Sequence, residues 1–325
     1  MDSRVNELLL KLGWKLPYIR FLSSRRTVIL LYHGVPREND GTSISGPVFE
    51  QHIVFLKQHF KIVAPNELWD RREPYENVRV MLTFDDGFRN NAEVVAPILR
   101  KYDAPAMFFV CSRHSVPGKY LWFAYLQALE QHFPDKGFYF RGDFFDMSSD
   151  QRHSSIRQLW QFLINLKPHP SAMYEAIEGE LPRLEDFISG QKLTDCYAGM
   201  TVEQVNELSR DPLFSIGVHT VDHPFLSKCQ LEEARRQILE NKKWIEQTSS
   251  KPCNSIAYPT GDYNAEVLEQ CRDLGLKHGH ALIPLLNTDV EYELPRMGIY
   301  SASLDLVGFK VQWGNVLQAI GVKVG

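Results

Sequence analysis

The sequence predicts an α/β fold, in which a parallel sheet either closes into a barrel or stays open as a doubly wound sheet. Six short apolar runs, rich in β-branched and aromatic residues, recur along the chain, and helical stretches separate them. The runs are continuously apolar rather than alternating, which is typical of strands covered on both faces, as in parallel sheets. Strand–helix alternation of this kind is found in both barrels and open sheets.

The six predicted strands follow one another at intervals that leave room for helices between them. They are TVILLYH (27–33), VRVMLTF (78–84), AMFFV (106–110), LFSIGVH (213–219), SIAYP (255–259) and HALI (280–283). The segment 49–60 repeats apolar residues at helical spacing, and 201–208 opens with a capping box of Thr201 and Gln204. A third helix is predicted over 231–247, with an apolar face made by Leu231, Ala234, Ile238 and Ile245.

Residues 113–200 interrupt this alternation. They contain helical pieces and a polar stretch, SSDQRHSS, and no segment in them predicts a strand. We interpret them as a helical insertion above the barrel, within one domain that spans residues 27–325. Long insertions often carry function, so a lid or substrate-shaping role is expected.

Residues 1–26 read as an amphipathic helix, with leucines and a tryptophan interspersed with lysine and arginine. We expect this helix to pack on the domain, and the alternative is that it lies on an anionic membrane surface. Charges stand where a signal peptide would be apolar, so export is not expected. No apolar run approaches the roughly 20 residues that span a bilayer.

Composition excludes further classes of function. The formal net charge of −4 and the pI near 6.3 provide no basic field for nucleic acid. The five cysteines are odd in number and form no C-x-x-C pair, which argues against a disulfide framework or a cysteine zinc site. We therefore expect a cytoplasmic protein, with the inner face of the membrane as a second location if residues 1–26 bind lipid.

Two stretches carry residues suited to metal chemistry. MLTFDDGFRN (81–90) ends a predicted strand on Asp85 and Asp86, and Asp-Gly after an apolar run is by itself a hairpin signal. GVHTVDHPFLS (217–227) places His219 and His223 near the end of another strand. One carboxylate and two histidines form a tripod that leaves positions open for water and substrate. Asp86 would complete the tripod, and Asp85 would be the base that deprotonates water.

The motifs TFDDG (83–87) and HTVDHP (219–224) together resemble those of the polysaccharide deacetylases of carbohydrate esterase family four. The resemblance extends to the opening LLYHGV, the helix beginning FEQHI and the late LPRMGIY, while AYPTG (257–261) matches a third family motif only loosely. The resemblance is greatest to family members that act in bacterial surface-polysaccharide synthesis, several of which have a similar helical insertion.

The resemblance implies an incomplete, distorted β/α barrel with the site at the carboxyl ends of the strands. It implies Asp85 as the base and Asp86, His219 and His223 as ligands of Zn²⁺, with Co²⁺ or Ni²⁺ as alternatives. The chain would then be a metal-dependent hydrolase that removes an N-acetyl or related acyl group from an amino sugar. Its substrate would be a glycan or a lipid-linked precursor.

Three family roles lack a clear match. Thr260 takes the place of a family tyrosine whose backbone N–H holds the oxyanion. The family arginine that braces the base aligns with Ala257, and Arg296 is the nearest replacement, although a surface or strand-end position would suit it as well. The late L-x-H motif, whose histidine protonates the departing amine, is absent, because His278 and His280 lie at a strand start, the non-catalytic end of a barrel.

We predict that His33 supplies this missing acid. It ends an apolar run, as Asp85 and His219 do, and the carboxyl ends of parallel barrel strands open onto one face. An imidazole with an ordinary pKa near 6.5 suits proton donation to an amine at neutral pH. The competing interpretations are a structural histidine and a further metal contact.

Two other functions use the same residues. A non-haem iron oxygenase also binds its metal through two histidines and one carboxylate, although usually on an antiparallel β scaffold. A catalytically impaired, glycan-binding relative would account for the missing motifs. The presence of Asp85 argues against a relative that only binds glycans, because binding alone needs no base.

Overall fold

The computed structural model describes residues 27–38, 44–68, 78–166 and 169–319, and side chains as far as Trp313. The predicted amphipathic helix over 1–26 lies outside the described residues.

Seven parallel strands of the described chain form a closed ring, in the order β1, β10, β9, β8, β7, β4 and β3. β3 closes the ring by pairing with β1 over six residues, and the short β2 adds to the outside of β3. The strands are β1 (Thr27–Tyr32), β2 (Lys61–Ile62), β3 (Arg79–Phe84), β4 (Ala106–Val110), β7 (Phe214–Val218), β8 (Ser255–Ala257), β9 (His278–Ala281) and β10 (Leu294–Gly298). The ring lacks one strand of the usual eight, so the predicted incomplete β/α barrel is confirmed.

All six predicted strands are present, with ends that differ by one or two residues, and β2 and β10 were not predicted. The helices around the ring are α3 (Gly46–His59), α4 (Ala96–Lys101), α9 (Val202–Arg210), α10 (Leu231–Ser249), α11 (Ala265–Asp273) and α12 (Leu304–Ala319), and a π-helical turn, η2 (Asn91–Val95), leads into α4. Single 3₁₀ turns are η1 (Pro65–Glu67), η3 (Arg113–Ser115), η4 (Leu184–Asp186), η5 (Leu226–Lys228) and η6 (Pro259–Gly261).

The three predicted helices are confirmed, with one correction. At the start of α9, Thr201 Oγ1 accepts from the Gln204 N–H at 3.2 Å and Gln204 Oε1 accepts from the Thr201 N–H at 3.0 Å, which is the predicted capping box. On α10, Ala234, Ile238 and Ile245 are buried, but Leu231 is 45% exposed. Leu231 is the first residue of the helix, and it lies outside the hydrophobic cluster that the other three residues join.

Alternate residues of each ring strand face the barrel interior. The interior cluster contains Ile29, Met81, Met107, Phe109, Ala257 and Leu294. Their neighbours in sequence, such as Leu30 and Leu82, belong to the core beneath the helices. Because residues two apart share a face, the same parity directs His33, Asp85 and Arg296 into the barrel mouth.

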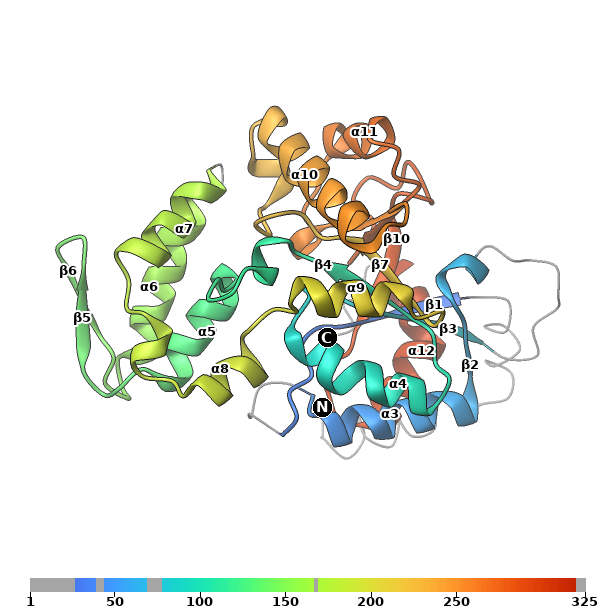
Figure 1. The fold of residues 1–325 in the computed structure, drawn as a ribbon, viewed down its shortest axis with the longest axis horizontal. Coiled ribbons are helices and arrows are strands. Elements are labelled where there is room, and N and C mark those ends of the chain that lie inside the picture. Colours follow the sequence, from blue (N-terminus) through green and yellow to red (C-terminus); the bar gives the residue numbers. More distant parts are fainter. Residues whose placement is uncertain (1–26, 39–43, 69–77, 167–168, 320–325) are drawn as a thin grey trace.

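The insertion 113–200 joins β4 to β7 and lies to one side of the barrel in Figure 1. It contains α5 (Trp122–His132), α6 (Arg152–Asn165), α7 (Pro170–Gly179) and α8 (Gly190–Cys196), as predicted for a helical insertion. It also contains an antiparallel hairpin of β5 (Gly137–Phe140) and β6 (Asp143–Asp146), so the expectation that it holds no strand was wrong. Its helices and hairpin pack on a hydrophobic cluster of their own, which includes Leu129, Leu159 and Leu184.

No described helix combines the length and the apolar character that crossing a bilayer requires.

Candidate active site

The carboxyl ends of six of the seven ring strands, all except β4, surround one cavity of about 270 Å³. All seven predicted site residues line it, namely His33, Asp85, Asp86, His219, His223, Thr260 and Arg296. The structure therefore brings together every residue that the sequence singled out, and the role of each stays a prediction.

Asp86, His219 and His223 form a buried group whose ligand atoms all lie within 4.8 Å of one another. Asp86 Oδ1 is 3.3 Å from His219 Nε2 and 3.4 Å from His223 Nε2. In the described structure neither carboxylate oxygen of Asp86 accepts a hydrogen bond of good geometry. A buried carboxylate with no donor is costly, and a cation between the three side chains would satisfy it. Two imidazole nitrogens and one oxygen are a donor set that suits Zn²⁺ and related divalent ions.

The orientation of His219 also suits a ligand. Its Nδ1–H donates to the carbonyl of Ala257 at 2.8 Å, which leaves the Nε2 lone pair facing Asp86. Burial alone would lower the pKa of His219, but the carboxylates of Asp85 and Asp86 raise it. Burial lowers the pKa of His223 to about 4, so its ring is neutral at pH 7 and keeps a lone pair for a metal.

Arg296 braces Asp85 through a bidentate ion pair. Its Nη1 lies 2.6 Å from Asp85 Oδ1 and its Nη2 lies 2.7 Å from Asp85 Oδ2, with the two side chains 1% and 4% exposed. Burial would raise the pKa of Asp85, but Arg296 and His219 outweigh it and hold the pKa below its ordinary value. Asp85 is therefore an ionised carboxylate in a fixed orientation beside the candidate metal centre.

His33 lies at the rim, where its ring stacks on Tyr300 with centroids 5.8 Å apart. The amide of Asn91 donates to the His33 carbonyl at 3.0 Å and so holds the chain at this point. His33 and Tyr300 also line a second cavity of about 350 Å³ that adjoins the first. His280, by contrast, lies inside the barrel against Phe109, below the mouth, which agrees with its expected place away from the chemistry.

The loops that carry the site have strained backbone. Asp86, Thr220 and His223 adopt φ values of 74°, 68° and 52°, and Thr260 adopts 55°. A residue other than glycine held in this left-handed region costs of order 1–3 kcal/mol. After Asp86, Gly87 has φ 74°, and a Cβ there would lie 2.7 Å from Val110 Cγ1. Gly87 is thus required by a tight turn that carries the two aspartates, and that turn leads into a helix rather than a hairpin.

Sequence reasoning missed the residues that the insertion brings to the site. The ring of Phe123 lies 4.8 Å from that of His223, and Trp122 Nε1–H donates to the His223 carbonyl at 3.3 Å. No local pattern shows where an insertion packs, so these two had no signal. Tyr300 did have a signal in the sequence. It follows Arg296 by four residues, and residues an even number apart along an extended chain point to the same side.

A family profile described as polysaccharide deacetylase matches residues 72–132 and 186–279. The two matched segments contain TFDDG and HTVDHP, and the gap between them falls in the insertion. The chain belongs to the polysaccharide deacetylase family. The segments that match the polysaccharide deacetylase profile include all three candidate metal ligands, Asp86, His219 and His223.

Among curated proteins, the chain is similar to YxkH of Bacillus subtilis (strain 168), which is named provisionally as a polysaccharide deacetylase. The two are 21% identical over 258 residues, which cover 77% of this chain and 62% of the length of YxkH. Among solved structures, IcaB from Ammonifex degensii has a TM-score of 0.57 at 18% identity, covering 89% of this chain and 97% of its own. The Streptococcus pyogenes deacetylase PplD, solved in complex with acetate, has a TM-score of 0.54 at 18% identity, covering 85% and 92%. At these identities the likeness to the solved structures establishes a shared fold.

Proposed function

We propose that this chain is a divalent-metal-dependent hydrolase that removes an N-acetyl group from an amino sugar of a polysaccharide or of its precursor. One observation carries the proposal: a buried Asp86–His219–His223 group lies beside an arginine-paired Asp85 in the mouth of a polysaccharide deacetylase barrel.

Asp86, His219 and His223 would hold the ion, with Zn²⁺ as the first choice and Co²⁺ or Ni²⁺ as alternatives. When bound, such an ion acts as a Lewis acid and lowers the pKa of a water molecule. Three protein ligands leave further positions for water and substrate, which is the pattern of catalytic rather than structural sites.

Asp85 would accept a proton from the attacking water, because it is ionised, oriented by Arg296 and within 3.8 Å of His219 Nε2. His33 follows β1 and Thr260 follows β8, which stand across the ring from each other, and His33 would give a proton to the departing amine. The Thr260 N–H would donate to the oxyanion, and a donor of this kind lowers the barrier by about 3–4 kcal/mol.

The alternatives receive less support. An Asp-His-His iron oxygenase is expected on an antiparallel scaffold, whereas every pairing within the ring is parallel. A glycan-binding relative without catalysis would need neither the buried base nor its arginine.

Acetate release from a panel of N-acetylated oligosaccharides tests the proposal. We expect chelator-treated protein to be inactive and to recover with Zn²⁺, Co²⁺ or Ni²⁺. His219→Ala should lose metal and activity together, while Asp85→Asn should retain metal and lose turnover. Near-full activity in Asp85→Asn would show that another group is the base, and consumption of 2-oxoglutarate would favour the oxygenase.

The finer substrate and location stay proposals. A lipid-linked precursor handled at the inner face of the membrane would suit the cysteine usage and the amphipathic pattern of residues 1–26. Failure of the full chain to sediment with anionic vesicles would remove the membrane part of this proposal.

A further inference from the structure

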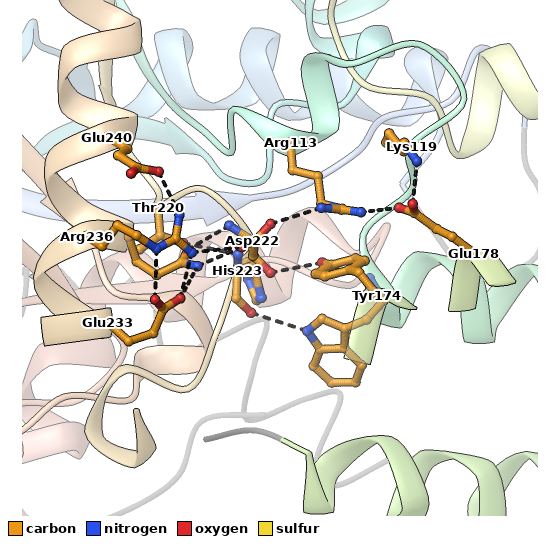
Figure 2. Close-up of polar contacts among 12 residues, drawn as sticks. Arg113, Lys119, Tyr174, Glu178, Thr220, Asp222, His223, Glu233, Arg236 and Glu240 are labelled. Carbon is orange, nitrogen blue, oxygen red and sulfur yellow. Dashed lines mark hydrogen bonds and ion pairs between the residues drawn. The ribbon is translucent and has the colours of Figure 1, made fainter. Parts of the chain in front are cut away.

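Asp222, one residue before the candidate ligand His223, lies between the insertion and a barrel helix. Figure 2 shows it at the centre of a polar network, with Tyr174 and Glu178 of α7 on one side and Glu233, Arg236 and Glu240 of α10 on the other. Its side chain is 8% exposed.

The insertion contacts Asp222 at two points. Arg113 Nη1 lies 3.3 Å from Asp222 Oδ1, and the hydroxyl of Tyr174 donates to the Asp222 carbonyl at 2.9 Å. Arg113 is itself fixed, because it pairs with Glu178 and its guanidinium lies 3.8 Å from the centre of the Tyr174 ring. Lys119 pairs with the other oxygen of Glu178.

Helix α10 holds Asp222 from the opposite side. Gln237 Nε2–H donates to Asp222 Oδ2 at 2.7 Å, and Gln237 Oε1 accepts from the Asp222 N–H at 2.9 Å. Arg236 lies 3.7 Å from the same carboxylate oxygen. Glu233 accepts from both Arg236 and Gln237, so the two α10 side chains are held in turn.

These contacts act on a loop whose backbone is strained. Thr220 and His223 both lie in the left-handed region, and within the loop the His223 N–H donates to Thr220 Oγ1 at 3.1 Å. The His223 carbonyl accepts from Trp122 of the insertion. The peptide groups on both sides of His223 therefore depend on side chains from the insertion.

We propose that Asp222 is a positioning residue for His223, through which Arg113 and Tyr174 of the insertion set the affinity of the Asp-His-His centre for a divalent ion. The proposal rests on the metal centre of the proposed function. None of the contacts described for the Asp222 side chain is with Asp86 or His219, so it acts through the backbone and the direction of the His223 ring. Partners that orient a ligand in this way typically change metal affinity by about 10- to 100-fold when they are mutated.

The test is a titration of the metal-free full chain with Co²⁺. Calorimetry measures the affinity, and the visible absorption spectrum of the bound ion reports its ligand geometry. Asp222→Asn places an amide donor against either Arg113 or Gln237, and we expect it to weaken Co²⁺ binding about 10- to 100-fold. Tyr174→Phe removes a single hydroxyl and should weaken binding about two- to tenfold. Both should alter the Co²⁺ spectrum, which reports the ligand geometry.

Glu180→Gln is the matched control, because it removes the partner of Arg141, 2.5 Å away, within the same insertion. It should leave both affinity and spectrum unchanged. The double variant Arg113→Gln/Asp222→Asn should bind Co²⁺ no more weakly than Asp222→Asn, because Arg113 acts through Asp222.

Co²⁺ affinity within twofold of wild type in folded Asp222→Asn overturns the proposal. If that variant does not fold, unchanged affinity and spectrum in Tyr174→Phe overturn it instead. A wild-type chain that binds Co²⁺ but releases no acetate contradicts the deacetylase function and leaves the positioning role standing. A wild-type chain that binds no Co²⁺ overturns both.

Discussion

Replacing Arg296 with methionine isolates the energetics of the buried ion pair with Asp85. The substitution keeps most of the aliphatic stem, which packs inside the barrel, and removes the guanidinium that donates to both carboxylate oxygens at 2.6 and 2.7 Å. Breaking a buried pair by removing one partner is expected to destabilise a protein by about 3–5 kcal/mol, because a desolvated charge is left behind. A typical domain has only about 5–15 kcal/mol of stability, so the loss should be large.

The loss should depend on pH, with a sign that follows from the carboxyl group. In the wild type the pKa of Asp85 is lowered, so its ionised form stabilises the fold above the ordinary pKa of about 3.9. In Arg296→Met, burial should raise the pKa of Asp85 above its unfolded value. Stability is then retained at low pH and lost as pH rises through the folded pKa. The deficit relative to wild type should therefore grow from pH 4 to pH 7.

Urea unfolding of the metal-free full chain, followed by circular dichroism, measures this deficit. The double variant Arg296→Met/Asp85→Asn supplies the control, because it removes both charges and should be more stable at pH 7 than Arg296→Met alone. A deficit below about 1 kcal/mol at pH 7, or one that does not change with pH, would refute the reasoning.

Three further substitutions follow from the structure. His33→Ala should retain metal stoichiometry and reduce kcat by about 10²–10⁴, the usual share of acid–base catalysis; loss of metal would make His33 a ligand, and an unchanged kcat would make it structural. Burial would raise the pKa of Glu293, but hydrogen bonds from Tyr263 and from backbone N–H groups outweigh it and lower the pKa to about 2. Glu293 should contribute about 3 kcal/mol of stability above pH 4.5 that is lost as pH falls toward 2, so Glu293→Gln should have a lower Tm than wild type at pH 6 and a smaller difference at pH 3. Gly87→Ala should lose about 1–3 kcal/mol in urea unfolding and weaken metal binding, because φ 74° and Val110 Cγ1 at 2.7 Å both oppose a Cβ; a stable, metal-binding variant would contradict the strain.

The sequence predicted the fold class and the residues that converge on one cavity, but it missed several strands. His33, Asp85 and His219 were expected to converge because parallel strands of a barrel end on one face, and the cavity that they line bears this out. Arg296 was uncertain from the sequence, since β10 was not recognised as a strand. Once β10 pairs with β1, with Arg296 opposite Ile29, parity alone directs the guanidinium inward.

The parts that were missed have physical reasons. β10 contains Pro295, which weakens a strand pattern, and β2 has only two residues. The hairpin of β5 and β6 turns on Arg141 and Gly142, with φ values of 51° and 92°. A glycine in the second position of a two-residue turn is a hairpin signal, but the flanking run is continuously aromatic and so lacks the alternation of a surface hairpin.

The place of the insertion in the chain has a consequence for how the barrel is made. β4 and β7 pair over five residues in the ring, yet about a hundred residues of chain separate them. Closing a flexible loop of that length costs about 4 kcal/mol of chain entropy, which a folding chain must overcome before the ring can close. The insertion has its own hydrophobic cluster, and its two ends meet where His114 Nε2 lies 2.9 Å from the carbonyl oxygen of Tyr197. A pre-folded insertion would turn the long loop into a short tether, so amides of α5 and α6 should gain protection from hydrogen exchange before those of β7 during refolding.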